Sequence, residues 1–148
     1  MKKFHSILLA SLLILSISCS SSSDERTFDS SKITRASEAE VEKVVEDFIL
    51  VEDGGTIEIP AGFFELNTQL IIDNKTDITI KGAGMDKTFL SFKGLQTGGE
   101  GVKIVGRNIV IQDLSIEDAP GDGVKAQHSD GITFRRINVT WTNGDKSL

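Results

Sequence analysis

The sequence predicts an all-β solenoid of stacked coils with an amphipathic helix over its N-terminal end. The main observation is an internal repeat. Gly101-Val102-Lys103 recurs 22 residues later as Gly123-Val124-Lys125, and the aliphatic pattern of residues 109–116 recurs 23 residues later. A repeat of this length is too short for a domain and fits one coil of a solenoid. No helical pattern follows Gly54, which argues against strands joined by crossover helices.

A single helix is expected just before the region of glycine-rich turns. All 14 glycines lie from Gly54 onward, whereas Ser37 and Glu40 have the spacing of a capping box that starts a helix. The apolar residues that follow form one helical stripe: Val41, Val44, Val45, Phe48 and Ile49. Asp53-Gly54-Gly55 ends the helix. Because a helix with one apolar face needs a partner surface, we expect it to cover the open end of the coils.

Short β-branched segments bounded by Gly, Asn and Asp are expected to form the strands. Apolar and polar residues alternate in several of them, which is the pattern of a strand with one buried face. The apolar residues that mark the strands before the repeat are Ile57, Ile59, Leu70, Ile72, Ile78, Ile80, Phe89, Leu90 and Phe92. In the repeated coils, Ile111 is expected to stack on Phe134 inside the solenoid.

Three segments carry a resemblance to a known superfamily. They are Asp53-Gly54-Gly55-Thr56-Ile57-Glu58-Ile59-Pro60-Ala61-Gly62, Ile78-Thr79-Ile80-Lys81-Gly82-Ala83-Gly84 and Gly131-Ile132-Thr133-Phe134-Arg135-Arg136-Ile137-Asn138-Val139. They resemble the entry coil, the second coil and the generic repeat of the pectate-lyase-like superfamily. The resemblance implies a right-handed parallel β-helix over residues 37–148, with roughly three to four coils and a capping helix. It implies no particular activity.

The C-terminal sequence shows no pattern that would cap a solenoid. The repeat continues to about Trp141, and Lys146-Ser147-Leu148 then ends the sequence. An uncapped coil exposes unpaired backbone groups and an open core. We therefore expect the chain to be the N-terminal part of a longer protein, with a partner chain over the open end as the alternative.

The first residues have the pattern of a targeting segment. Lys2-Lys3 precedes an apolar run from Ile7 to Ile17, which is too short to span a membrane as a helix but typical of a secretory signal. Cys19, the only cysteine, follows the run and resembles the acceptor cysteine of a bacterial lipoprotein. We expect a signal peptide over residues 1–18, a lipidated flexible tether over residues 19–36, and attachment to the bacterial outer membrane or cell surface. Ordinary secretion with a free thiol is the alternative.

The charge of the chain restricts its partners. The formal net charge is −6. Binders of nucleic acid are basic, so nucleic acid is not an expected partner. Membrane contact is expected through the lipid anchor only. An acidic ligand stays open, because a local strip of cations can override the net charge.

Two groups of outward residues are the candidates for ligand binding. If the extra residues at 93–101 bulge out as a loop, one outward column consists of Lys81, Gln112 and Arg135. The second group is the pair Lys103 and Lys125. Solvated surface charge is the alternative interpretation of both groups.

The cations suggest chemistry on acidic polysaccharides. Polyuronates such as pectin or alginate carry a carboxylate on each sugar, and lyases or C5-epimerases remove the proton beside it. A neighbouring cation or metal ion stabilises the charge that develops, and a basic side chain takes the proton. Arg135 and Lys125 are therefore the candidates for catalytic residues, and Lys81, Gln112, Arg135 and Trp141 those for substrate binding. Trp141 is expected to point outward, where an aromatic ring can stack on a sugar, and packing against downstream sequence is the alternative.

Other charged residues are expected to have structural roles. The repeat places Asp113 beside Arg136 and Arg107 beside Asp130, as surface ion pairs that contribute about 0–1 kcal/mol each.

Oxygen ligands for calcium are also present near a Gly-rich turn: Glu117, Asp118, Asp122 and Asp130. Asp118 and Asp122 are the weak metal candidates, and ordinary turn-forming aspartate is the alternative. His128 lacks a second His or Cys partner and makes a poor metal site. No cofactor is evident, although calcium stays open.

Two functions follow from these observations. The first is a lipid-anchored β-helix protein that binds or processes an acidic polysaccharide, as a lyase or epimerase would. The second is a non-enzymatic surface adhesin or periplasmic scaffold. A cluster of outward Asp, Lys, Arg or His on adjacent coils would favour the enzyme, and its absence would favour the scaffold.

Overall fold

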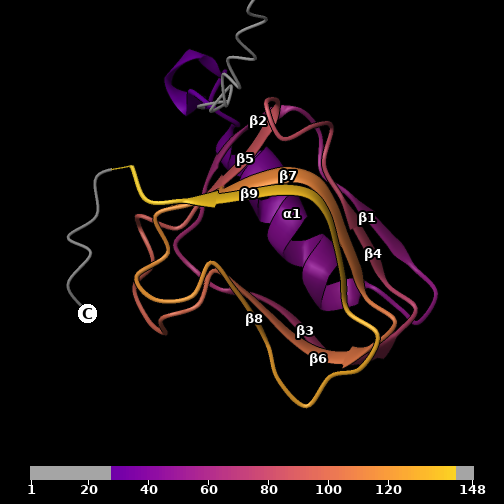
Figure 1. The fold of residues 1–148 in the computed structure, drawn as a ribbon. Coiled ribbons are helices and arrows are strands. Elements are labelled where there is room, and N and C mark those ends of the chain that lie inside the picture. The colour runs from indigo at the N-terminus through magenta and orange to yellow at the C-terminus, as the bar shows by residue number, and fades with distance from the viewer. Residues whose placement is uncertain (1–27, 143–148) are drawn as a thin grey trace, which may run out of the picture.

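A computed structural model describes residues 28–142 of the 148-residue chain. Two parallel β-sheets and one α-helix form an arrangement consistent with a β-helix-like fold (Figure 1). The helical elements come first: η1 (Ser30–Lys32) and α1 (Glu38–Leu50). The strands follow: β1 (Thr56–Glu58), β2 (Gly62–Glu65), β3 (Leu70–Thr76), β4 (Thr79–Lys81), β5 (Thr88–Ser91), β6 (Val102–Arg107), β7 (Val110–Glu117), β8 (Val124–Ala126) and β9 (Thr133–Thr140).

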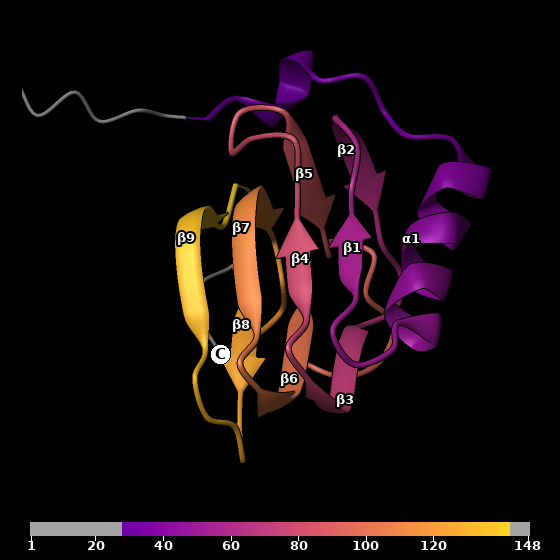
Figure 2. The same ribbon diagram turned by 90° about the vertical axis from the view of Figure 1, so that its right-hand side faces the viewer.

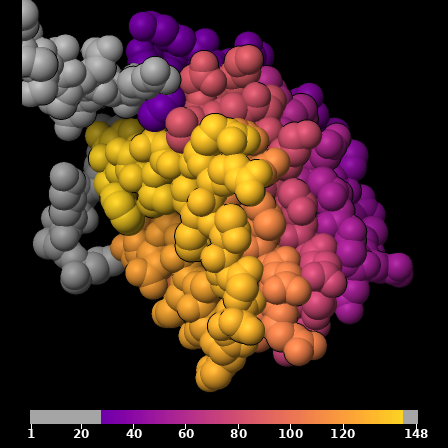
Figure 3. Space-filling model, turned by 45° about the vertical axis from the view of Figure 1, so that its right-hand side comes forward, coloured from indigo at the N-terminus to yellow at the C-terminus, as the bar shows by residue number. Residues whose placement is uncertain are grey.

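Each strand pairs with the equivalent strand of the next coil. In the larger sheet, β1, β4, β7 and β9 lie side by side (Figure 2). The long strand β7 continues past its pairing with β4 and pairs through Ser115–Glu117 with β5, which pairs with β2. The smaller sheet has the order β3-β6-β8. Successive coils therefore follow one another across the molecule in sequence order, as the bands of colour in Figure 3 show.

Aliphatic side chains at equivalent positions of the coils stack inside. Ile57, Ile80, Ile111 and Phe134 are partners in register across the four strands, which confirms the predicted stack of Ile111 on Phe134. The three isoleucines are buried. Phe134 is 49% exposed, because within the described residues no strand pairs with the far side of β9.

Left-handed residues turn the chain from the smaller sheet into the larger one. Asp77, Asn108 and Gly131 stand before the strands of successive coils, with φ of 59°, 53° and 67°. The Asn108 side-chain amide donates to Asp77 Oδ1 at 3.0 Å, so adjacent turns are also linked. Asn, Asp and Gly adopt this conformation more readily than other residues, which explains why they recur at this corner.

Helix α1 covers the end of the stack beside β1, as predicted (Figure 2). Its capping box is formed: Ser37 Oγ accepts from the Glu40 amide at 3.4 Å, and Glu40 Oε2 accepts from the Ser37 amide at 2.7 Å. Val44 and Phe48 are buried against the coils, but Ile49 is exposed, so the predicted apolar stripe is only partly covered. Within residues 28–142, no helix has the length and apolar character that a membrane span requires.

Residues 28–36 lie across the outer face of the larger sheet, as a segment that we call the strap. Arg35 forms a parallel bridge with Phe63 of β2, and the Ala36 amide donates to the Phe63 carbonyl at 2.9 Å. These residues fall within the predicted flexible tether of residues 19–36, but in the structure they are bound to the β-sheet.

Candidate functional site

The predicted column of polar residues lies on the outer face of the larger sheet. The register pairs Lys81 with Gln112 and Gln112 with Arg135, and it adds Glu58 before Lys81. The intervening residues 93–101 form a loop, as the prediction required. Neighbouring strands lie about 4.8 Å apart, so the four side chains form a continuous strip. We call Glu58, Lys81, Gln112 and Arg135 the outer column.

The charges of the outer column are partly paired. Lys81 Nζ lies 3.5 Å from Glu58 Oε1, and both side chains are exposed, so the pair contributes at most about 1 kcal/mol. Arg135 is exposed and forms no ion pair with any residue from 28 to 142. The guanidinium of Arg135 is therefore the cation of this strip that an external anion could bind most readily.

A bidentate ion pair stands directly beside the outer column. Arg136 donates through Nε and Nη2 to the Asp113 carboxylate, with 2.7 Å between Nη2 and Oδ2, which confirms the predicted pair. Arg136 lowers the pKa of Asp113, chiefly by hydrogen bonding, and the charges of Lys81 and Arg135 act in the same direction. Three cations therefore gather around one carboxylate.

The corner of the coil explains why Asp113 and Arg136 meet. Both residues are left-handed, with φ of 61° and 48°, and they interrupt their strands at equivalent positions. Gly82 stands at the same corner one coil earlier, where a Cβ atom would overlap the Asp113 carbonyl oxygen. Gly82 is thus required for the close approach of the backbone that brings Asp113 to the outer column.

The second predicted group lies on the other sheet. Lys103 and Lys125 are partners in register between β6 and β8, so Lys125 does not share a surface strip with Arg135. Lys125 Nζ lies 2.7 Å from Glu100 Oε1, and Gln69 donates to Glu100 Oε2 at 2.6 Å. Hydrogen bonds from Lys125 and Gln69 lower the pKa of Glu100 to about 2, and Glu100 in turn raises the pKa of Lys125. A lysine with a raised pKa is a poor general base.

The other candidates from the sequence are engaged in local contacts. Asp118 accepts from the Thr142 amide at 2.6 Å and from the Thr142 hydroxyl at 2.8 Å. Asp122 lies 3.8 Å from Lys125 Nζ, and the Trp141 indole donates to the Ala119 carbonyl at 2.6 Å. Within residues 28–142, no group of three or more His, Cys, Asp or Glu is arranged to hold a metal ion.

One predicted ion pair is wrong. Arg107 and Asp130 are joined by a backbone bridge at the expected register. The structure shows no ion pair between their side chains within residues 28–142. The Asp130 backbone is instead fixed between Gly106 and Asn108: its amide donates to the Gly106 carbonyl and its carbonyl accepts from the Asn108 amide. Register alone therefore did not predict where these two side chains point.

Glu117 has an environment that the sequence did not indicate. It faces outward from β7, yet it is only 1% exposed because the strap covers it. Ser30 Oγ donates to Glu117 Oε2 at 2.9 Å, and Oε1 has no hydrogen-bond partner among residues 28–142. Burial raises the pKa of Glu117, and the charges of Asp118 and Asp29 add to this effect. The carboxyl group lines a cavity of about 220 Å³ together with Ser91 and Lys93.

Comparison with known proteins bears on the fold. No protein family and no curated protein match this sequence. Among solved structures, the chain is similar to one described as "a new PL6 alginate lyase complex with trisaccharide", with a TM-score of 0.61 and 21% sequence identity. The likeness covers 80% of this chain and 23% of that chain. The chain thus spans about a quarter of the length of a polysaccharide lyase, and at this identity the likeness shows the β-helix-like fold alone.

Proposed function

We propose that this chain forms the first coils of a right-handed parallel β-helix that binds an acidic polysaccharide along the outer column. The observation that carries the proposal is the alignment of Lys81, Gln112 and Arg135 on adjacent strands, with Arg135 left without an acidic partner among the described residues. An extended polyanion can contact several coils at once along such a strip. The alginate lyase with a similar fold, solved with a trisaccharide, supports a polysaccharide as the ligand class.

The proposed continuation of the coils rests on their regular pairing. Residues one coil apart occupy the same position in their strands from β1 to β9, and the inward stack of Ile57, Ile80 and Ile111 is continuous. Phe134 is at the next position of this stack and is half exposed. Another coil of the same pattern would bury it.

A lyase or C5-epimerase reaction is the enzymatic form of the proposal. The cations beside Asp113 would stabilise the negative charge that develops when the proton next to a sugar carboxylate is removed. The reaction also needs a base, and Lys125 is unsuited to that role while it is paired with Glu100. We therefore assign to this chain the binding of the polyanion, and any cleavage to the whole protein.

A non-enzymatic surface scaffold is the second candidate. It is favoured by the pairing of most cations near the outer column, because Lys81 binds Glu58 and Arg136 binds Asp113. Ion pairs of this kind link neighbouring coils on the surface, and they need no ligand. Binding and product formation discriminate between the two functions.

The test is a titration of the chain with alginate and with polygalacturonate at low ionic strength. We call the chain without the predicted signal peptide of residues 1–18 the mature chain and use it here. We expect Arg135→Glu to weaken binding about tenfold, because it places a carboxylate where a sugar carboxylate should bind, a loss of about 1.4 kcal/mol. Lys75→Glu makes the same charge change on β3, which belongs to the other sheet, and should leave binding nearly unchanged. Equal effects of the two variants, or no binding by the parent chain, would contradict the proposal.

Product formation should be followed with the whole protein, through the absorbance of unsaturated uronate products in the same polymer solutions. A rise in absorbance identifies a lyase, whereas binding by the whole protein without products identifies a carbohydrate-binding scaffold. An unchanged polymer with an altered ratio of uronic acid epimers would identify an epimerase.

We further propose that the chain is exported and attached to the bacterial cell envelope through a lipid on Cys19, which lies outside the described residues. The proposal rests on the signal-like run that precedes this cysteine. Metabolic labelling with a fatty acid should mark the expressed protein, and Cys19→Ala should remove the label. Label that survives in the variant would show that this cysteine is not the acceptor.

A further inference from the structure

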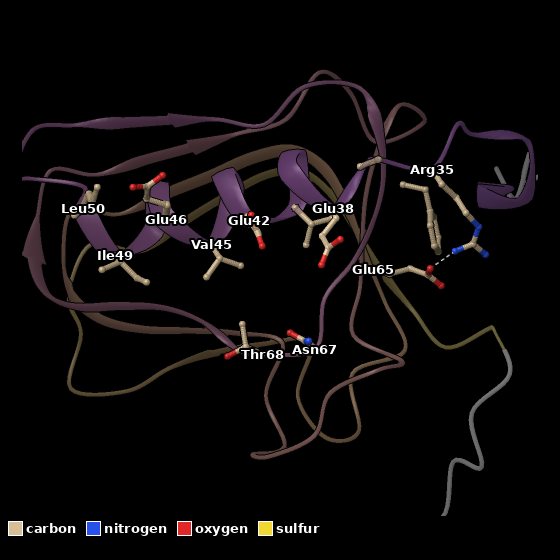
Figure 4. A pocket seen from close by; sticks show the side chains of 13 residues that line it. Arg35, Glu38, Glu42, Val45, Glu46, Ile49, Leu50, Glu65, Asn67 and Thr68 are labelled. Atoms are coloured by element: carbon tan, nitrogen blue, oxygen red, sulfur yellow. Dashed lines mark ion pairs between the residues drawn. The ribbon is translucent and has the colours of Figure 1, made fainter.

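A groove lies beside the capping helix, away from the outer column. It has a volume of about 870 Å³ and runs between α1 and the segment that joins β2 to β3 (Figure 4). Val45 and Ile49 of the helix face Asn67 and Thr68 across the opening. Phe63 and the ion pair of Arg35 with Glu65 close one end.

The helix side of this groove carries large apolar side chains that residues 28–142 leave largely exposed. Val44 and Phe48 bury the other side of α1 against the coils, whereas Ile49 and Leu50 are 70% and 64% exposed. The hydrophobic effect therefore favours their burial by another molecule.

The rim of the groove is strongly acidic. Glu38, Glu42 and Glu46 follow one another at intervals of four residues, so they form a ridge along α1. None of them forms an ion pair with any residue between 28 and 142. The cation in the lining, Arg35, is already paired with Glu65. The groove thus has an apolar floor beside three unpaired carboxylates.

The apolar floor and the acidic rim together determine which kind of molecule can bind in the groove. An acidic polysaccharide would be repelled, and so would the equivalent acidic helix of a second copy. A segment with lysines or arginines beside a row of leucine-like side chains satisfies both the charge and the apolar surface. Because the groove follows a helix of 13 residues, about 20 Å long, a helix can lie along it with apolar residues three and four positions apart.

We propose that this groove, formed by α1 and residues 63–68, is a docking site for a basic amphipathic helix of a partner protein. The site is independent of the outer column. It would attach a protein partner to the N-terminal end of the coils while the outer face stays free for polysaccharide.

The test is a fluorescence titration of the mature chain with a synthetic amphipathic helix that carries leucines on one face and lysines beside them. The matched control peptide has glutamate in place of lysine and should not bind. We expect the double variant Glu42→Lys/Glu46→Lys, and separately Ile49→Ser, to weaken binding about tenfold or more, which corresponds to about 1.4 kcal/mol. Glu52→Lys makes the charge change of one of the two glutamate substitutions at a position outside the groove lining, and it should have little effect.

All substituted side chains are exposed, so the variants should fold, and circular dichroism checks this. Equal binding of both peptides, or unchanged binding by the groove variants, would overturn the proposal. Sedimentation of the chain alone supplies a further outcome. If the chain forms dimers that Ile49→Ser abolishes, the groove binds a second copy and the assignment to a basic partner is wrong.

Discussion

Replacing Ile111 by aspartate should severely destabilise the protein. Ile111 is 1% exposed and stacks between Ile80 and Phe134, so the carboxylate would be buried among aliphatic side chains with no cation beside it. Burial of an unpaired charge, together with the lost packing, costs about 4–5 kcal/mol or more. The whole free energy of unfolding of a domain is about 5–15 kcal/mol, so about a third of the stability or more would be lost. Urea denaturation followed by circular dichroism measures the change.

The neighbouring substitution Gln112→Asp supplies the matched control. Gln112 is half-buried on the outer face, between Lys81 and Arg135, so a new carboxylate there stays hydrated and gains two cationic neighbours. We expect its free energy of unfolding to change by less than about 1 kcal/mol. Losses of similar size at the two positions would contradict the assignment of the inner and outer faces of β7.

The repeat predicted the register of the coils because a parallel stack places residues one period apart next to one another. Ile111 and Phe134 pair as expected, and so do Gln112 and Arg135. The register also placed Asp113 beside Arg136, since both residues occupy the same left-handed corner. These predictions need only the sequence spacing and the alternation of a strand.

Contacts between segments that do not repeat could not be predicted in this way. Lys125 is bound by Glu100, whose position depends on how the loop of residues 93–101 folds back on the sheet. The helical stripe around Ile49 had the correct period, but how much of it is covered depends on the width of the coil beneath. In the candidate site, therefore, the outer column follows from the sequence, whereas the partners of its cations had to come from the structure.

The burial of Glu117 is another feature that the sequence could not predict. The alternation of β7 places it outward, where a carboxylate is normally hydrated, and only the strap changes this. Residues 28–36 have no repeat and no strong strand pattern. The sequence therefore does not indicate that they cross the sheet and cover Glu117. A buried carboxyl group with one unsatisfied oxygen is the result.

Replacing Glu117 by glutamine should stabilise the protein at neutral pH. Burial raises the pKa of the Glu117 carboxyl in the folded chain, so the folded state favours the protonated form. Below the ordinary carboxyl pKa of about 4.5, the group is protonated in both the folded and the unfolded state, so its burial carries no charge penalty. As the pH rises from there through the raised pKa of the folded state, the unfolded chain ionises more readily and the folded state loses stability. Glutamine has similar volume, can still accept from Ser30, and never ionises.

The difference in free energy of unfolding between Glu117→Gln and the parent should therefore be near zero in acid and grow to about 1–3 kcal/mol at neutral pH, the cost of an uncompensated buried group. Denaturation of both chains across this pH range measures it. Glu52→Gln, at an exposed carboxylate after α1, controls for the general effect of removing one negative charge and should show no such growth. A glutamine variant that is less stable at neutral pH would show that the Glu117 carboxylate is needed as an anion, which would require a cation or ordered water beside Oε1. In that case, the cavity under the strap would be a binding site for that cation or water.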